Sequence, residues 1–322
     1  MSSPARAGSA TVQLPVYLLT GPTGTGKSDW AIRLAQAAPV EIVSVDSALV
    51  YRGMDIGTSK PAAELRAGGP QHLVDICDPV ESYSAGRFAT DAMTVIAAVH
   101  ARRRVPLLVG GTMLYLRALL KGLAPLPQAS APLRREIDER AARSGWPALH
   151  AELARLDPEA AARIHRNDSQ RIQRALEVCL TTGRRLSQLQ RETTSPLAGA
   201  PLKAWALAPR DRSLLHHRLA SRFHAMMAAG FLEEVRALHG RGDLTARHSS
   251  MRAVGYRQLW AHLEGECGLA EAVERGIAAT RQLAKRQLTW MRAETAPRWL
   301  DPEADELSWN RDVRRELSQL GL

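Results

Sequence analysis

The stretch that decides the fold is GPTGTGKS, residues 21–28. It follows a short, mostly apolar run at residues 16–20, and residues 29–35 after it carry apolar side chains at helical spacing. A strand, a Gly-x-x-x-x-Gly-Lys-Ser loop and a helix in that order predict a phosphate-binding loop. In such a loop the backbone N–H groups, the Lys27 ammonium and the Ser28 hydroxyl face negative charge. The same geometry holds the diphosphate of a nucleotide or of another compound, so the loop alone leaves the ligand open.

Further short apolar runs predict the rest of a sheet. Residues 41–45 and 105–109 are typical of buried strands, and residues 204–207 are a fourth candidate. Gly110 and Gly111 close the third strand and permit close approach of the backbone. Strands that alternate with helical segments predict an α/β fold with a parallel sheet flanked by helices. Ligands of such sheets bind at the carboxyl ends of the strands.

A change of composition near residue 123 predicts a second domain. The stretch 133–189 is helical, rich in arginine and almost devoid of strand signals. We therefore expect a P-loop core formed by residues 11–122 and 198–322, interrupted by an all-helical insertion at 123–197. The C-terminal part of the core is mostly helical, with interruptions expected at Gly230, Gly240 and Gly255.

The charge of the chain favours a polyanionic partner. Its 43 basic residues against 33 acidic ones give a net charge of +10 and a pI near 10.1. Basic globular proteins of this kind often bind nucleic acid. Five of the basic residues are lysines and the rest arginines, so an arginine-rich proteome is an alternative explanation.

Cysteine spacing and hydropathy bear on the cellular compartment of the protein. Cys77, Cys179 and Cys267 are far apart and outside any Cys-x-x-Cys pattern, which gives no support to a disulfide framework or a thiolate zinc site. No run of about 18 apolar residues occurs. We expect a cytoplasmic monomer with no membrane partner.

Two polar residues lie shortly after predicted strands. Asp46 comes after the second strand, where a parallel sheet places it beside the phosphate-binding loop. It is a candidate magnesium ligand, a candidate general base, or a plain helix cap. Thr112 follows Gly110 and Gly111 at the start of a helical pattern, which makes it either part of an anion site or an ordinary cap.

The C-terminal region contains a helix with one basic edge. At 100° per residue, Arg281, Lys285 and Arg292 fall within a narrow arc of the segment 279–292, while apolar residues fill a wide one. The nearby segment MRAVGYR, residues 251–257, adds two arginines around a glycine and a tyrosine. Basic residues interleaved with aromatic ones suit RNA, and a solvated basic face is the alternative.

Seven segments in this order together resemble the bacterial tRNA dimethylallyltransferase family, over about residues 16–300. The resemblance implies a P-loop, nucleoside-kinase-like sheet with a helical insertion that grips the anticodon stem of tRNA. The segments are GPTGTGKS, SVDSALVYRGMDIGTSKP, HLVDICDPVESYSAGRF, LLVGGTMLYLRALLKGL, RNDSQRIQRALEV, MRAVGYRQLW and ATRQLAKRQLTWMR.

The resemblance also implies the reaction. A dimethylallyl group moves from dimethylallyl diphosphate to N6 of adenosine 37, which is 3′-adjacent to the anticodon, in tRNAs reading codons that begin with U. The products are N6-(dimethylallyl)adenosine and diphosphate. On this interpretation the loop at 21–28 holds a diphosphate leaving group rather than a phosphoryl donor, and catalysis stabilises the charge that develops on it.

Site residues carry over by the same resemblance. Asp46 is implied as the base that orients the adenine amine and accepts its proton, with Thr112 and Lys27 as further catalytic residues and Mg²⁺ at Ser28. The implied diphosphate-binding residues are Gly21, Pro22, Thr23, Gly24, Thr25, Gly26, Lys27, Ser28, Arg218 and Arg222. The resemblance leaves open which of the two arginines contacts the diphosphate. The implied tRNA contacts are Asp46, Ser47, Ala48, Leu49, Thr112, Arg134, Gln170, Arg171, Ile172, Gln173, Arg174, Arg252, Ala253, Val254, Gly255, Tyr256, Arg257, Lys285, Arg286, Gln287, Leu288, Thr289, Trp290, Met291 and Arg292.

Two other function classes share the P-loop. A small-molecule kinase would bind ATP and phosphorylate an acceptor without tRNA. A non-catalytic, nucleotide-dependent RNA-binding protein would bind ATP or GTP and tRNA but would leave the RNA unmodified.

Overall fold

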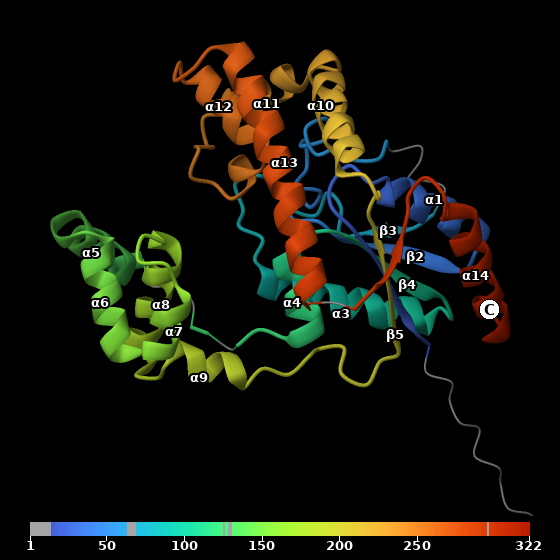
Figure 1. Ribbon diagram of the computed structural model, residues 1–322, viewed down its shortest axis with the longest axis horizontal. Coiled ribbons are helices and arrows are strands. Elements are labelled where there is room, and N and C mark those ends of the chain that lie inside the picture. The colour runs from blue at the N-terminus through green and yellow to red at the C-terminus, as the bar shows by residue number, and fades with distance from the viewer. Residues whose placement is uncertain (1–13, 63–68, 125, 128–130, 295) are drawn as a thin grey trace, which may run out of the picture. The chain divides into compact units, whose positions relative to one another are not determined.

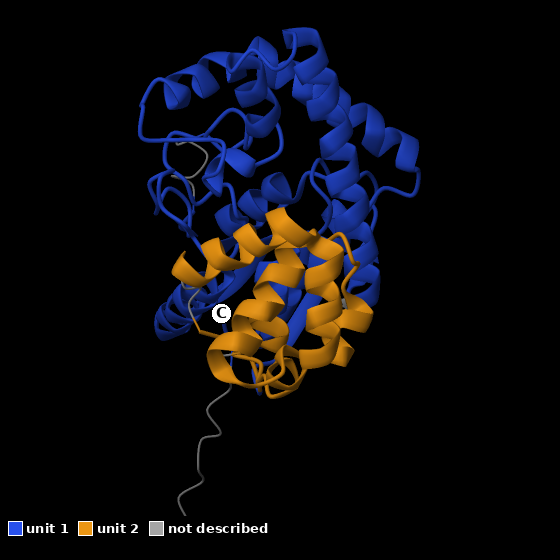
Figure 2. Ribbon diagram, turned by 90° about the vertical axis from the view of Figure 1, so that its left-hand side faces the viewer, with its two compact units in different colours: residues 1–117, 199–322 blue, residues 118–198 orange. Residues whose placement is uncertain are grey.

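A computed structural model describes residues 14–62, 69–124, 126–127, 131–294 and 296–322. The chain divides into two compact units, residues 1–117 with 199–322 and residues 118–198 (Figure 2). The first division falls inside helix α4 (Met113–Lys121), earlier than the boundary at 123 expected from the sequence. The core boundary expected at residue 11 lies outside the described residues.

The larger unit is built on a parallel sheet (Figure 1). Its strand order is β3-β2-β4-β1-β5-β6, and each adjacent pair is parallel. The predicted strands correspond to β1, β2, β4 and β5, which confirms the α/β class. Two very short strands, β3 and β6, had no signal in the sequence. The bounds are Val16–Thr20, Val40–Val45, Gln71–His72, Val105–Gly110, Leu202–Leu207 and Arg298–Leu300 for β1 to β6.

Helices cover the sheet because alternate strand residues point to opposite faces. Tyr17 and Leu19 of β1 share a buried cluster with residues of α1 (Lys27–Ala37) and α14 (Glu306–Gln319). In that cluster the rings of Trp30 and Trp309 lie 5.4 Å apart. Helix α3 (Ala85–Ala101) packs against β2 and β4 with side chains outside this cluster.

Four helices of the same unit gather near the carboxyl ends of the strands (Figure 1): α10 (Arg212–Ala228), α11 (Phe231–His239), α12 (Tyr256–Leu263) and α13 (Leu269–Glu294). The short helix η1 (Ser250–Arg252) precedes α12. The predicted interruptions are confirmed, because Gly230 and Gly240 bound α11 and Gly255 precedes α12. Gly255 has φ +92°, and a Cβ there would lie 2.8 Å from the Phe231 ring.

The described residues of the smaller unit form helices and their connections, with no strand among them. Besides the end of α4 it contains α5 (Ala131–Ser144), α6 (Trp146–Leu156), α7 (Pro158–Arg163), α8 (Ser169–Thr182) and α9 (Leu186–Arg191). Buried Asp157 accepts hydrogen bonds from the N–H of Ala160 and from the N–H and hydroxyl of Ser187, which fixes α7 against α9. No helix in the described part of the chain is long and apolar enough to span a membrane.

Candidate active site

The phosphate-binding loop presents Lys27 at the first position of α1. Gly26 precedes it with φ +81°, a conformation that glycine adopts at low cost. Lys27 Nζ donates to the carbonyl of Pro22 at 2.7 Å. Burial lowers the pKa of Lys27 to about 7; the Asp46 carboxylate opposes this shift, and the Arg222 guanidinium adds to it. A bound anion would therefore stabilise the charged form of Lys27, which burial disfavours.

Gln287 of α13 joins this loop to the end of β4. Its side-chain oxygen accepts the N–H of Thr23 at 2.9 Å, and its Nε2 donates to the carbonyl of Gly111 at 2.8 Å. The hydrogen bond from Gln287 to residue 111 requires a glycine at that position. A Cβ there would lie 2.7 Å from both Gln287 Nε2 and the carbonyl oxygen of Gly21. A Cβ at Gly110 would meet the carbonyl of Val45 at 2.2 Å, so the expected close approach at this glycine pair is confirmed.

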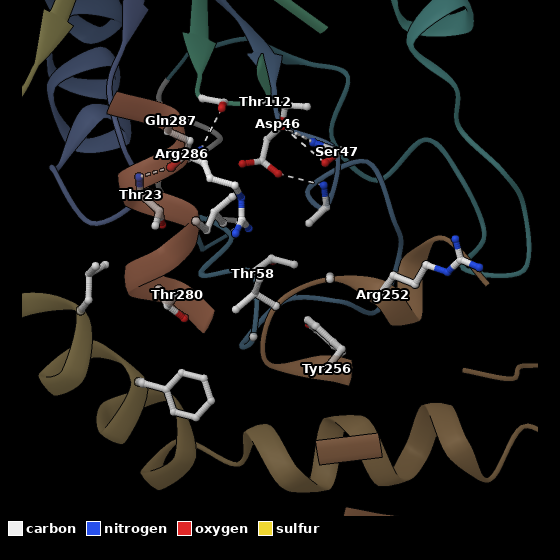
Figure 3. A pocket seen from close by; sticks show the side chains of 18 of the residues that line it. Thr23, Asp46, Ser47, Thr58, Thr112, Arg252, Tyr256, Thr280, Arg286 and Gln287 are labelled. Atoms are coloured by element: carbon white, nitrogen blue, oxygen red, sulfur yellow. Dashed lines mark hydrogen bonds between the residues drawn. The ribbon is translucent and has the colours of Figure 1, made fainter. Parts of the chain in front are cut away.

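Two cavities meet at this edge of the sheet. The P-loop cavity, about 600 Å³, is lined by residues of the loop and α1 together with Asp46, Ser59, Arg218 and Arg222. The adjoining cavity, about 430 Å³, is lined by Ser47, Thr112, Phe223, Arg252, Tyr256 and Arg286 among others (Figure 3). Six residues line both cavities: Thr23, Asp46, Thr58, Gly111, Arg222 and Gln287.

Asp46 stands at the junction of the two cavities. Its Oδ1 accepts the N–H groups of Ala48 at 2.8 Å and Leu49 at 3.4 Å, and the residues that follow form turns rather than a helix. Within the described chain, Oδ2 has no hydrogen-bond partner. Asp46 thus caps a turn with one oxygen and keeps the other available, which differs from the helix cap considered as an alternative.

Thr112 precedes α4 and fixes the turn after Asp46. Its Oγ1 accepts the N–H of Ser47 at 3.0 Å and donates to the Ser47 hydroxyl at 3.4 Å (Figure 3). The α4 helix uses the backbone carbonyl of Thr112, which accepts the N–H of Leu116. The Thr112 side chain therefore joins the loop after β4 to the loop after β2 and does not cap its own helix.

The two α10 arginines differ in their surroundings. Arg222 is partly buried and donates from Nε to Ser59 Oγ at 2.8 Å. Burial lowers the pKa of Arg222, while the carboxylates of Asp46 and Asp29 act in the opposite direction. Arg218 is exposed and pairs with Glu303.

The segments expected to contact tRNA divide into exposed and buried residues. Arg252, Arg257, Lys285, Arg286 and Arg292 are exposed and form no ion pair with an acidic side chain in the described chain. Thr289 is also exposed, while Trp290 is half-buried. Six residues from these segments are buried inside the protein: Ile172, Gly255, Tyr256, Gln287, Leu288 and Met291.

In the smaller unit the candidate tRNA contacts are held by acidic neighbours. Buried Glu177 pairs with Arg134 at 2.5 Å and with Arg174 at 3.1 Å. Gln173 donates to Asp138, Arg171 lies near Asp168, and Gln170 is exposed.

Sequence reasoning missed three residues at the site. Thr58 and Ser59 line the cavities, and Glu234 contacts the backbone that precedes them. The GMDIGTSKP segment, residues 53–61, lies within one of the stretches that carry the family resemblance, but nothing in it indicates which hydroxyl reaches Arg222. Across the described residues, no cluster of three or more His, Cys, Asp or Glu forms a metal site.

Comparison with known proteins places this arrangement in a family. The model described as IPP transferase matches residues 49–294, and a second, described as Isopentenyl transferase, matches residues 14–71. The chain belongs to the IPP transferase family. The first match alone spans most of the chain, including Thr58, Ser59, Thr112 and both α10 arginines.

Relatives of this IPP transferase family member cover nearly its whole length. A protein from Methylococcus capsulatus, named tRNA dimethylallyltransferase, is 58% identical over 91% of this chain and 94% of its own. One of the same name from Bordetella parapertussis is 57% identical over 87% and 90%.

Solved structures agree with the fold. A tRNA isopentenylpyrophosphate transferase from Bacillus halodurans is 34% identical with a TM-score of 0.69, over 95% of this chain and 99% of its own. A eukaryotic dimethylallyltransferase described as acting on tRNA is 28% identical with a TM-score of 0.77, over 90% and 74%.

Proposed function

We propose that this member of the IPP transferase family is a monomeric tRNA dimethylallyltransferase. It transfers the dimethylallyl group of dimethylallyl diphosphate to N6 of adenosine 37, 3′-adjacent to the anticodon, in tRNAs reading codons that begin with U. The family match and the relatives' names support tRNA prenylation as the reaction. The donor, the position and the residue roles rest on the site.

Two partly buried cations support a diphosphate ligand. Lys27 and Arg222 line one cavity at the N-terminus of α1, and burial lowers the pKa of both. A diphosphate there would pair with both charges and accept hydrogen bonds from the loop N–H groups. The observation that carries the proposal is the position of Asp46, which lines both this cavity and the adjoining one. One carboxylate then reaches the donor and the acceptor.

The reaction follows from this placement. The N6 lone pair forms a bond to C1 of the dimethylallyl group while the bond from C1 to the diphosphate oxygen breaks. The electron pair of the broken bond leaves with the diphosphate, where Lys27, Arg222 and the loop N–H groups stabilise it. N6 gives its proton to Asp46, whose Oδ1 is held by the turn and whose Oδ2 is available. Thr112 keeps that turn in place through Ser47.

The oxygen groups of the P-loop cavity fit Mg²⁺. Ser28 lines the cavity and offers the hydroxyl that binds Mg²⁺ in phosphate-binding loops of this pattern. Protein-bound Mg²⁺ usually keeps several waters and takes further oxygens from substrate phosphates, so few protein groups are needed. Mg²⁺ bound beside Ser28 would supply positive charge to the diphosphate.

The exposed cations of the core support tRNA binding. Arg252, Arg257, Lys285 and Arg286 are free of acidic partners in the described chain, so they are available for phosphates. Arg252 and Arg286 also line the adjoining cavity, where the acceptor adenosine would enter. The smaller unit, with its own arginines, would grip the anticodon stem. We restrict the tRNA-contacting side chains to the exposed members of the predicted segments.

One experiment separates this function from its rivals. Purified protein is incubated with unmodified tRNA and dimethylallyl diphosphate, and the RNA is digested to nucleosides for mass spectrometry. We expect one dimethylallyl group on adenosine, with none in a Lys27→Ala variant. ATP consumption without tRNA would favour a small-molecule kinase. tRNA binding without a modified nucleoside would favour the non-catalytic RNA-binding protein.

A further inference from the structure

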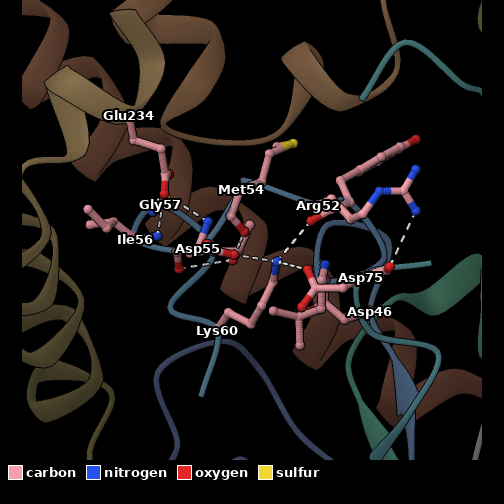
Figure 4. A network of polar contacts seen from close by, with 12 residues as sticks. Asp46, Arg52, Met54, Asp55, Ile56, Gly57, Lys60, Asp75 and Glu234 are labelled. Atoms are coloured by element: carbon pink, nitrogen blue, oxygen red, sulfur yellow. Dashed lines mark hydrogen bonds and ion pairs between the residues drawn. The ribbon is translucent and has the colours of Figure 1, made fainter. Parts of the chain in front are cut away.

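The carboxylate of Glu234, on α11, accepts hydrogen bonds from three successive backbone N–H groups of a distant loop. Oε2 accepts from Asp55 at 2.8 Å and from Ile56 at 2.7 Å, and Oε1 accepts from Gly57 at 3.0 Å (Figure 4). Oε1 also accepts the hydroxyl of Tyr256 at 2.5 Å. Hydrogen bonds to a charged carboxylate are among the stronger ones in proteins. One side chain thus fixes a loop that is far away in the sequence.

The loop from residue 55 to residue 60 has further fixed contacts. A Cβ at Gly57 would lie 2.0 Å from the ring of Phe231, so this position needs glycine and lies directly against α11. At the other end, Lys60 pairs with Asp55 and Asp75 at 2.5 Å each (Figure 4). The Lys60 side chain is almost completely buried. The loop backbone is therefore held at both ends.

The part of the loop between these contacts faces the two cavities. Thr58 lines both of them, and Ser59 Oγ accepts from Arg222 Nε at 2.8 Å. Ser59 has φ +50°, a left-handed conformation that is unfavourable for a non-glycine residue and persists where the surroundings enforce it. The contacts of Glu234 and Lys60 supply that enforcement. Arg222 in turn stands near Lys27, whose pKa it helps to lower.

We propose that Glu234 is a positioning residue for the donor site, which holds the 55–59 loop so that Ser59 orients Arg222 toward the diphosphate. The inference rests on the proposed function of the P-loop cavity. Through Tyr256, a buried residue inside the 252–257 segment, the same carboxylate also connects this loop to the lining of the adjoining cavity, where the acceptor would enter. Glu234 touches neither substrate and acts through the loop.

The test compares Glu234→Gln with Glu233→Gln, a neighbour on α11 whose exposed side chain contacts Arg236. The dissociation constant of inorganic diphosphate is measured by calorimetry, and KM for donor and for tRNA by prenylation assays. We expect diphosphate binding by Glu234→Gln to weaken about tenfold, since a charged acceptor of several hydrogen bonds is lost. The donor KM rises accordingly, the tRNA KM changes less than about twofold, and Glu233→Gln matches wild type.

A double-mutant cycle excludes a merely structural effect. If Glu234 acts through Arg222, then Glu234→Gln will weaken diphosphate binding no further in an Arg222→Ala background. A lowered melting temperature with unchanged diphosphate affinity would overturn the inference, as would full additivity with Arg222→Ala.

Should Glu234→Gln fail to fold, Tyr256→Phe removes one hydrogen bond from the carboxylate and keeps the buried ring, and the same cycle applies. A wild-type protein that prenylates tRNA while these variants bind diphosphate normally contradicts the role of Glu234 and leaves the function intact. A wild-type protein that neither binds diphosphate nor modifies tRNA contradicts both.

Discussion

The N–H of Thr23 donates to the side-chain oxygen of Gln287 across 264 positions of the chain. The other end of the same amide binds the carbonyl of Gly111. Helix α13 therefore fastens the phosphate-binding loop to the end of β4. A residue that the family resemblance implied as a tRNA contact is buried, with both polar groups engaged inside the protein.

Replacing Gln287 by glutamate should weaken donor binding. Glutamate keeps an acceptor for the Thr23 N–H but places a second oxygen against the carbonyl of Gly111, where a donor is needed. We expect diphosphate affinity to fall about tenfold, because one buried hydrogen bond is lost and a carbonyl is left unpaired. Isothermal calorimetry measures this. Gln282→Ala, an exposed change on the same helix, is the control, and equal affinities in both variants would remove Gln287 from the donor site.

Diphosphate binding should take up a proton at Lys27. In the free protein the pKa of Lys27 is about 7, so the amine is mostly neutral at pH 8. A bound diphosphate favours the ammonium and raises this pKa, hence binding at pH 8 captures a proton, and affinity falls as pH rises above 7. Calorimetry in two buffers of different ionisation enthalpy counts the proton.

The control for this prediction is Lys27→Arg. Arginine stays charged at pH 8, so proton uptake by the protein should disappear, and the remaining pH dependence belongs to the diphosphate itself. If wild type and Lys27→Arg take up the same number of protons at pH 8, then Lys27 is already protonated in the free protein and the prediction is wrong.

The sequence predicted the elements that depend on local pattern. Strand β1 was found at its observed bounds, and the glycine interruptions around α11 and α12 were placed correctly. Strands β3 and β6 were missed because two or three residues carry no periodicity, and their pairing comes from neighbouring strands.

The candidate site shows the same division. The P-loop and Asp46 were found because a spacing or a strand end marks them. Glu234 and the inward role of Gln287 were not, since each acts through backbone groups more than 170 positions away. The family resemblance placed Gln287 among the tRNA contacts, whereas at 100° per residue it falls within the apolar arc of α13 and its amide packs inward. Similarly, the division between the units falls inside α4, which a turn-rich segment beyond the helix cannot reveal.

Salt dependence should reveal the basic edge of α13. Arg281 and Lys285 are exposed and free of acidic partners in the described chain. If they contact tRNA phosphates, binding releases counterions, and the slope of log affinity against log salt becomes shallower by about 0.7–0.9 for each contact removed. The measurement compares wild type with Arg281→Ala/Lys285→Ala. Arg275→Ala, on the same helix but paired with Glu271, is the control. Slopes that coincide would leave the basic edge as a solvated face.

The role of Asp46 can be decided by a magnesium titration. As the base, Asp46 accepts the proton of N6, so Asp46→Asn should keep near-normal binding of tRNA and donor. Its single-turnover rate should fall about 10²–10⁴-fold, the range for loss of a general base. Asparagine retains an oxygen that accepts the N–H of Ala48, so the turn after β2 should persist and the loss is chemical rather than structural.

As a metal ligand, Asp46 would instead set the affinity for Mg²⁺, and excess Mg²⁺ would restore much of the rate. Single-turnover rates at saturating tRNA and donor are therefore measured over a range of Mg²⁺ concentrations, with Ser28→Ala as the comparison. We expect added Mg²⁺ to rescue Ser28→Ala and not Asp46→Asn, because only Ser28 would hold the ion while Asp46 holds the proton. Rescue of Asp46→Asn by Mg²⁺ would assign Asp46 to the metal and require another base for N6.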